Sequence, residues 1–170
     1  MNNEIYINKI ISSLKTKLNE NNELYRNYYK GEVILSKVKF NSSLDDISIL
    51  EGINITLPEE YIEFLKISNG AKLFKDDYYG SNYILELYSL EKICEEKNFY
   101  LHDLNISNCY PIGILLDNCE LIVYEDRVKD KKYYLGLSDN SERFEYGFQE
   151  WLDKFIIAQG NEFWLLNNSY

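Results

Sequence analysis

The chain has 170 residues, of which 45% are hydrophobic and 27% charged, so it is long enough to bury the core of one domain without disulfides or metals. Its net charge of −10 is unevenly distributed, because residues 1–40 carry +3 and residues 41–170 therefore carry −13. A body this acidic repels phosphate backbones, which argues against nucleic-acid binding and favours basic protein partners. The alternative is that the acidity serves only solubility.

The sequence shows no segment for export or membrane insertion. Its first residues lack the basic and apolar regions of a signal peptide, and no apolar run approaches the roughly 20 residues that a membrane span requires. The three cysteines are an odd number without paired spacing, which argues against a disulfide framework. We therefore expect a cytoplasmic protein with reduced thiols.

The first predicted element is a helix over residues 5–18. Its apolar residues share one helical face: Ile7, Ile10, Ile11, Leu14 and Leu18. Residues 23–40 fit two structures, since a further helical turn could reach Gly31 and a strand could run over residues 33–40. We treat residues 1–40 together as an N-terminal helical extension.

Two helix starts follow in the sequence. Ser42 and Ser43 each precede an aspartate by three residues, and this capping-box pattern predicts a short helix to about Leu50. Pro58 is favoured in the first turn of the next helix, where two glutamates suit the positive end of the helix dipole. The apolar face of this helix is formed by Tyr61, Phe64 and Leu65. Its end is predicted at Gly70, which can adopt a left-handed conformation.

After Gly70 the pattern changes to short strands and two helices. The predicted strands cover residues 71–74, 83–88, 109–116, 121–124 and 133–137, with 144–146 as a short final strand. Ser89 caps a helix over residues 90–98, and the last helix runs from Gly147 to Gly160. The apolar residues 163–166 could dock on the body or pair with a second copy. This order predicts an α+β fold with N-terminal helices, a central antiparallel sheet of about four to six strands and a closing C-terminal helix.

The segment from Ile55 to Gly70 resembles the signature of the SUKH superfamily, also called the Smi/Knr type. In that family a Leu-Pro pair opens a helix, an aromatic residue and a Phe-Leu pair follow, and Asn-Gly closes it before the first strand. The matching residues are Leu57, Pro58, Tyr61, Phe64, Leu65, Asn69 and Gly70. Looser matches extend the resemblance, so we divide the single domain 1–170 into a family-like core over 43–158 and a tail over 161–170. One departure is the turn at 116–120, which has no glycine.

The resemblance implies a protein-binding domain without catalytic residues or cofactors. Many bacterial members look like immunity proteins that neutralise a toxin of a contact-dependent or polymorphic toxin system, often a nuclease. Because nucleases attract phosphates and are often basic, the acidic body would complement such a toxin. The alternative is a non-enzymatic interaction module in regulation or signalling. We expect a protein partner, a basic toxin domain, with no nucleic acid and no membrane, and either a monomer or a homodimer.

Two acidic segments are candidates for the partner-binding residues. The first is the loop between the predicted strands 71–74 and 83–88, where two carboxylates are followed by two aromatic side chains: Asp76, Asp77, Tyr78 and Tyr79. Tyrosines often anchor interfaces, although a solvated hairpin loop with locally packed tyrosines is the alternative interpretation. The second is the turn with Asp117, Asn118 and Glu120.

Catalytic and metal sites find little support in the sequence. His102 is the only histidine, and no local pattern links it to a cysteine nucleophile or to a zinc knuckle. The paired carboxylates lie on expected turns rather than across a cleft, where a glycosidase would need them. A small hydrolase is therefore a third, weaker hypothesis, and we expect no catalytic residue, metal or cofactor.

Overall fold

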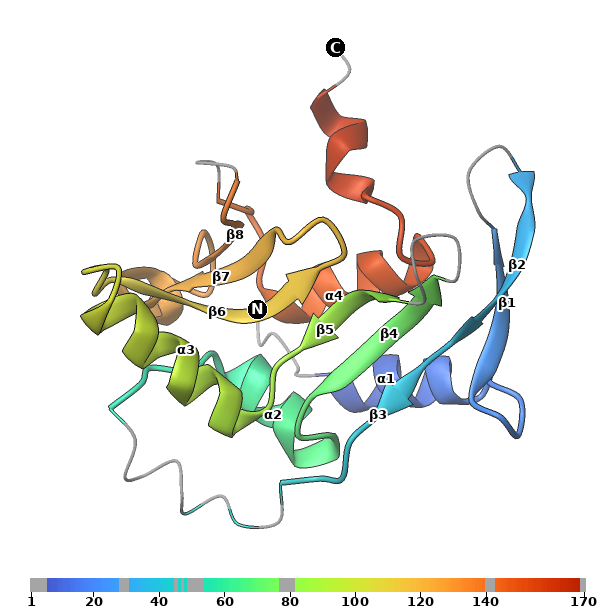
Figure 1. Ribbon diagram of the computed structural model, residues 1–170, viewed down its shortest axis with the longest axis horizontal. Helices are drawn as coiled ribbons and strands as arrows, with labels where there is room; N and C mark the ends of the chain where they lie inside the picture. The colour runs from blue at the N-terminus through green and yellow to red at the C-terminus, as the bar shows by residue number, and fades with distance from the viewer. Residues whose placement is uncertain are drawn as a thin grey trace.

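The computed structural model describes residues 6–27, 31–44, 46, 48, 54–76, 82–139 and 143–168, with the side chains of Asp76 and of residues 166–168 left aside (Figure 1). The helices are α1 (Ile7–Lys15), α2 (Glu59–Ile67), α3 (Leu90–His102) and α4 (Phe148–Ile157), with the 3-10 helices η3 (Glu125–Asp130) and η4 (Phe163–Asn168). The strands are β1 (Glu23–Asn27), β2 (Val33–Lys37), β3 (Lys39–Phe40), β4 (Ala71–Asp76), β5 (Asn82–Leu87), β6 (Cys109–Leu115), β7 (Glu120–Tyr124) and β8 (Leu135–Leu137).

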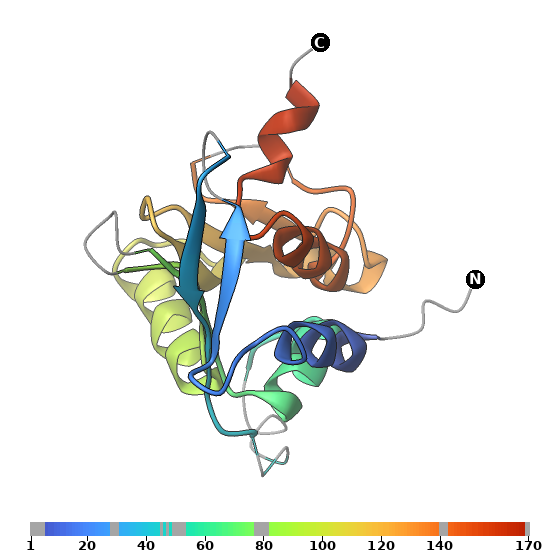
Figure 2. The ribbon, with the colours of Figure 1, turned by 90° about the vertical axis from the view of Figure 1, so that its right-hand side faces the viewer.

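An antiparallel sheet forms the centre of the protein. Its six strands follow the order β3-β4-β5-β6-β7-β8, and β1 and β2 form a separate hairpin. Figure 2 shows α3 on one face of the sheet and α1, α2 and α4 together on the other. The α+β prediction, including an antiparallel sheet of four to six strands and a closing helix, is confirmed.

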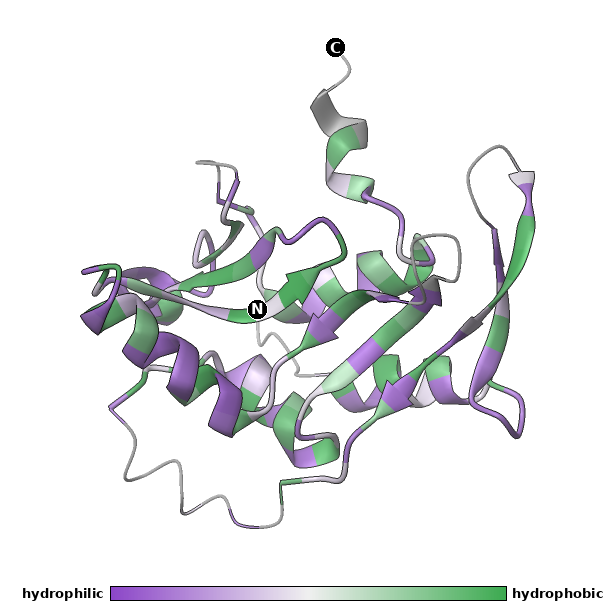
Figure 3. Cartoon of the chain, viewed as in Figure 1, coloured by the Kyte–Doolittle hydropathy of each residue, from purple (hydrophilic) through white to green (hydrophobic). Residues whose placement is uncertain are grey.

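The core lies between the sheet and the layer of α1, α2 and α4. Helix α4 follows the predicted helical spacing, and its large apolar residues are fully buried: Phe148, Trp151, Leu152 and Phe155. The ring of Phe148 meets Tyr61 of α2 at a centroid distance of 4.7 Å. Helix α3 is largely hydrophilic (Figure 3), since it buries only Leu90, Ile93 and Tyr100.

The expected N-terminal helical extension is correct only for α1. Residues 23–27 form β1 instead of a helical turn, and they pair antiparallel with β2 over their whole length. Arg26 is buried and its guanidinium donates a hydrogen bond to the Gln159 carbonyl at 3.2 Å, whereas Tyr25 next to it is 72% exposed. A strand is recognised by apolar residues at every second position, and a buried arginine on the inner face does not fit that pattern.

Two shorter expectations differ from the structure. Residues 144–146 form no strand, and the pairing of this segment with β8 is limited to a single bridge between Arg143 and Gly136. Tyr133, just before β8, has a left-handed φ of 57°, which interrupts the extended backbone there. Residues 41–44 are not helical, and most of the helix expected to follow them lies outside the described residues. The tail does dock on the body, because Trp164 stacks on Trp151 at 5.9 Å.

Candidate partner-binding site

The Leu-Pro signature joins α2 to the middle of the sheet. Pro58 has a φ of −61° and precedes the first residue of α2, as its fixed ring geometry favours. Tyr61 is fully buried, and its hydroxyl lies 2.7 Å from the Tyr88 carbonyl and 2.9 Å from the Ile112 carbonyl. Burial raises the pKa of this hydroxyl, so it stays a neutral donor. The motif tyrosine thus ties α2 to the end of β5 and to β6.

The Asn-Gly end of the signature joins α2 to α3. The Asn69 side chain accepts a hydrogen bond from the Leu90 N–H at 2.8 Å and donates to the Glu91 carboxylate at 3.1 Å, so it caps α3 from outside. Gly70 has a φ of +92°, and a Cβ there would lie 3.0 Å from the Leu87 carbonyl oxygen. These residues have a structural role, as predicted for the apolar motif positions.

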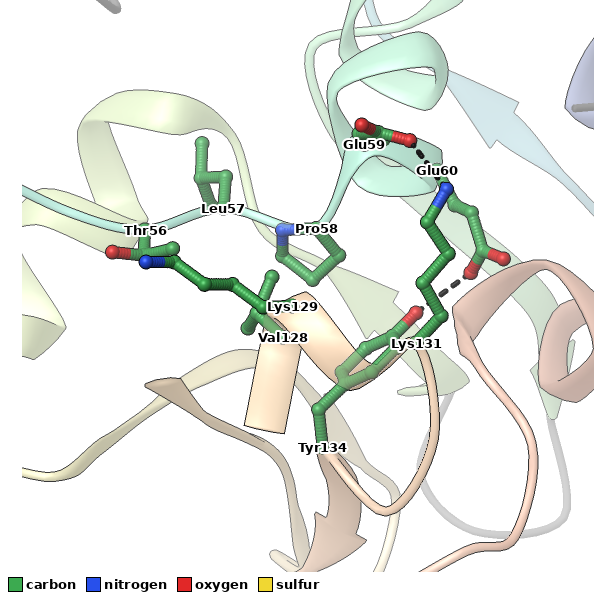
Figure 4. Close-up of a pocket in the computed structure, with 9 residues that line it drawn as sticks. All are labelled: Thr56, Leu57, Pro58, Glu59, Glu60, Val128, Lys129, Lys131 and Tyr134. Atoms are coloured by element: carbon green, nitrogen blue, oxygen red, sulfur yellow. Dashed lines mark hydrogen bonds and ion pairs between the residues drawn. The ribbon is translucent and has the colours of Figure 1, made fainter. Parts of the chain in front are cut away.

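A pocket of about 350 Å³ lies between the start of α2 and the segment from η3 to β8 (Figure 4). At its base the Glu60 carboxylate accepts hydrogen bonds from the Tyr134 hydroxyl at 2.6 Å and from the Gln149 N–H at 3.0 Å. The Tyr134 oxygen in turn accepts from the Phe148 N–H at 2.6 Å. Glu60 and Tyr134 therefore cap the N-terminus of α4, where a carboxylate is stabilised by the helix dipole.

The polar groups of this first pocket are used for structure. Gly147 allows their close packing, because a Cβ there would lie 2.6 Å from a Glu60 carboxylate oxygen. Burial and the nearby Glu60 charge raise the pKa of Tyr134, so its hydroxyl stays protonated at neutral pH and keeps its hydrogen bond to Glu60. At the rim, Glu59 and Lys131 form an exposed ion pair at 3.0 Å.

The first predicted partner-binding segment can be placed only in part. Asp76 is the last residue of β4, and its side chain together with Asp77, Tyr78 and Tyr79 lies outside the described residues. The following strand, β5, begins at Asn82, so this segment does connect two paired strands as expected. A role in partner binding remains a prediction for these four residues.

The second predicted segment is the tight turn between β6 and β7. Asn118 takes the left-handed conformation, with a φ of 65°, and so replaces the glycine that the family resemblance led us to expect. Asp117 stabilises the turn by accepting a hydrogen bond from the Cys119 N–H at 3.1 Å. The Glu120 carboxylate accepts from the Tyr100 hydroxyl at 2.5 Å, which ties β7 to α3. Asp117 is exposed and lines a pocket.

Beside this turn lies a second pocket of about 310 Å³ that combines carboxylates with apolar side chains. Its acidic lining comes from three separate segments: Asp117 after β6, Asp139 after β8 and Glu162 before η4. Its apolar lining includes Trp164 and Leu165, and Leu165 is 52% exposed. Sequence reasoning missed Asp139 and Glu162, because residues about 20 positions apart leave no local pattern when only the fold brings them together.

The electrostatics of the second pocket favour a cation. Partial burial and the neighbouring charges of Asp117 and Asp139 raise the pKa of Glu162. The thiol of Cys119 donates to an Asp139 oxygen at 3.0 Å, and burial raises its pKa, so it is not a reactive thiolate. Within the part of the chain that the structure describes, no cluster of histidine, cysteine and carboxylate side chains could hold a metal ion. The pocket thus places three carboxylates beside apolar side chains, a composition complementary to a cationic side chain.

Comparison with known proteins identifies the family of this chain. The model of the SMI1/KNR4 family (SUKH-1) matches residues 41–166, which include the complete Leu-Pro to Asn-Gly signature. The chain belongs to the SMI1/KNR4 family. It is also similar to the uncharacterized protein YobM of Bacillus subtilis (strain 168), with 33% identity over 94% of this chain and 91% of YobM. No solved structure gives a significant match.

The SMI1/KNR4 domain is known in toxin-immunity proteins, as the resemblance led us to expect. The matched region reaches residue 166 and therefore includes the tail as far as Trp164 and Leu165. Both the acidic turn and the second pocket thus lie inside the family domain. Among the described residues, no helix is both long and apolar enough to span a bilayer.

Proposed function

We propose that this SMI1/KNR4-family protein is an immunity protein that binds a basic toxin domain in the cytoplasm and neutralises it without catalysing a reaction. The family membership and the charge of −13 on residues 41–170 support a basic partner. Opposite charges speed the encounter of two proteins and orient them, so an acidic inhibitor suits an enzyme that attracts phosphates.

The second pocket is the observation that carries the proposal. Asp117, Asp139 and Glu162 line the same pocket, and partial burial together with the charges of the two aspartates raises the pKa of Glu162, so the pocket lacks a cation that would stabilise this carboxylate. A lysine or arginine from the partner would supply it, while the exposed Leu165 beside the carboxylates supplies apolar contact. Arginine is enriched among interface hot spots, so a partner arginine is a suitable anchor for these carboxylates.

The non-enzymatic part of the proposal rests on how the described polar groups are used. Glu60 and Tyr134 cap α4, and Asn69 caps α3. Burial raises the pKa values of all three thiols, Cys94, Cys109 and Cys119, which keeps them protonated at neutral pH. His102 is exposed at the end of α3.

The first test is to recover the partner and measure its affinity. A tagged protein is isolated from its source cells, and co-purified proteins are identified by mass spectrometry. We expect the C-terminal domain of a large secreted toxin. Its affinity is then measured by calorimetry for the wild type and for the triple variant Asp117→Asn, Asp139→Asn, Glu162→Gln, which we expect to bind roughly 100-fold more weakly, at about 1 kcal/mol per lost charge contact.

A matched control separates the pocket from net charge. The triple variant Glu95→Gln, Asp126→Asn, Asp130→Asn removes the same number and types of exposed carboxylates elsewhere, and it should bind within about threefold of wild type. If both triple variants bound the partner equally weakly, the loss of affinity would come from the change in net charge and not from the pocket. Recovery of a regulatory or signalling protein instead of a toxin would favour the interaction-module alternative and contradict the immunity role.

A further inference from the structure

The N-terminal end of the protein has a charge opposite to that of the body. Residues 1–40 contain seven lysines or arginines and four glutamates. After β2 the chain continues directly into β3, and the alternation of side chains buries Val38 while Lys37 and Lys39 stay exposed. Because β3 is an edge strand of the six-stranded sheet, these two lysines lie at an open border of the molecule.

A cleft of about 490 Å³ lies at this border, between the end of α1 and β3. Lysines from three points of the chain line it: Lys15 at the end of α1, Lys37 at the end of β2 and Lys39 in β3. Its apolar lining is provided by Leu18, Val38 and Phe40. The remaining lining residues are asparagines, so no carboxylate among the described residues lines the cleft.

These three lysines differ from others in the same chain. Lys66, Lys72 and Lys154 each pair with a glutamate: Glu63, Glu86 and Glu150. By contrast, the described residues provide no ion pair for the three lysines of the cleft, and the Lys15 ammonium lies 4.8 Å from the centroid of the Phe40 ring. Glu23 opposes Lys37 across the hairpin, but its carboxylate accepts a hydrogen bond from the Asn19 side chain at 3.3 Å. The chain has a net charge of −10, yet these three lysines line one cleft without an ion-pair partner among the described residues, so the cleft can bind an external anion.

The outer face of the hairpin extends this surface with apolar residues. Leu35 lies two residues before Lys37 on the same face of β2 and is 45% exposed, and Val33 precedes it at 61% exposure. Tyr25 is the cross-strand partner of Leu35 and is also exposed. The surface therefore changes along one strand from apolar to basic.

We propose that this cleft and the adjoining hairpin face bind an acidic peptide segment of a partner protein, with carboxylates on the lysines and an apolar side chain on Leu18 and Phe40. The volume and the apolar lining exceed what a small inorganic anion uses, and they match a peptide that carries both kinds of group. A polynucleotide fits less well, because beyond the cleft its phosphates meet a body of charge −13. This site is independent of the acidic pocket and of the immunity role.

The test uses a fluorescein-labelled peptide of ten residues, six Glu and four Leu, and measures fluorescence anisotropy with the full-length protein. We expect saturable binding that weakens at least tenfold between 50 and 500 mM NaCl. The triple variant Lys15→Gln, Lys37→Gln, Lys39→Gln should bind about tenfold more weakly than wild type. The triple variant Lys66→Gln, Lys92→Gln, Lys154→Gln carries the same net charge and should bind like wild type.

Several results would overturn the proposal. Equal affinity of wild type and the cleft variant would exclude the three lysines, and equal weakening of both variants would show only a net-charge effect. Tighter binding of a single-stranded DNA decamer than of the peptide would assign the cleft to nucleic acid. Salt-sensitive dimerisation in sedimentation velocity that is lost in the cleft variant would show that the cleft takes the acidic body of a second copy. Five of the six substituted lysines are exposed and Lys154 is partly exposed, so both variants should fold, and circular dichroism checks this.

Discussion

Replacing Tyr61 by phenylalanine tests how the family signature stabilises the fold. The substitution keeps the ring, which packs on Phe148 at 4.7 Å and on Phe64 at 5.4 Å, and removes only the hydroxyl. That hydroxyl is the buried donor near the carbonyls of Tyr88 and Ile112. The Ile112 carbonyl also accepts the Tyr88 N–H at 2.9 Å, so the Tyr88 carbonyl is the group that loses more.

The expected cost follows from this hydrogen bond. A neutral hydrogen bond contributes about 1 kcal/mol, and a buried acceptor left unsatisfied adds desolvation, so Tyr61→Phe should lower the free energy of unfolding by about 1–2 kcal/mol. For a protein of this size that corresponds to a fall in Tm of roughly 2–8 °C. Urea unfolding followed by circular dichroism measures the free energy, and calorimetry measures Tm.

The control is Tyr25→Phe, which removes the same atom from a side chain that is 72% exposed. It should change stability by less than about 0.5 kcal/mol, as surface substitutions usually do. If Tyr61→Phe is as harmless as Tyr25→Phe, the hydroxyl does not hold α2 to the sheet, and the structural reading of the signature is wrong.

Three further predictions concern the turn glycine, the thiols and Glu162. Gly70→Ala should cost more than about 2 kcal/mol, because a left-handed φ is combined with close contacts, whereas Gly31→Ala has φ +81° and open space and should cost about 1 kcal/mol in urea unfolding. Iodoacetamide should alkylate the three cysteines of the folded protein at pH 7.5 more slowly than free cysteine, because burial raises their pKa values, and rapid alkylation would refute this. The raised pKa of Glu162 means that the folded state binds its proton more tightly than the unfolded state does, so this group lowers stability as pH rises above about 4.3. Glu162→Gln should therefore keep or raise Tm at pH 7 while it weakens partner binding. A lower Tm with unchanged binding would contradict both halves of that prediction.

The sequence predicted the elements whose patterns are local. The Leu-Pro to Asn-Gly segment predicted α2 and its end, and the 3.6-residue spacing from Phe148 to Phe155 predicted α4. The hairpin was missed in part, because its inner face carries the buried polar residues Arg26 and Ser36 where a strand pattern needs apolar ones. Burial of polar side chains depends on partners elsewhere in the chain, such as the carbonyls of Gln159 and Lys75, which no local window contains.

The residues of the candidate site were also predicted only in part. Asp117 was predicted from an acidic turn and lines the second pocket, and its role in partner binding stays a prediction. Asn118 and Glu120 were also predicted as binding residues. In the structure Asn118 forms the turn and Glu120 accepts a hydrogen bond from Tyr100, and a binding role for both stays a prediction. Asp139 and Glu162 join Asp117 only through the packing of β8 and η4 around the turn, which a sequence pattern does not reveal.

The most direct test of the central claim is protection of cells from the cognate toxin. The toxin domain recovered by affinity purification is expressed from an inducible promoter together with wild-type protein, the acidic-pocket triple variant at residues 117, 139 and 162, or the matched control at residues 95, 126 and 130. At equal protein levels, the account predicts survival with wild type and control and death with the acidic-pocket variant. Survival with all three proteins would contradict the assignment of the pocket, and death with wild type would contradict immunity itself.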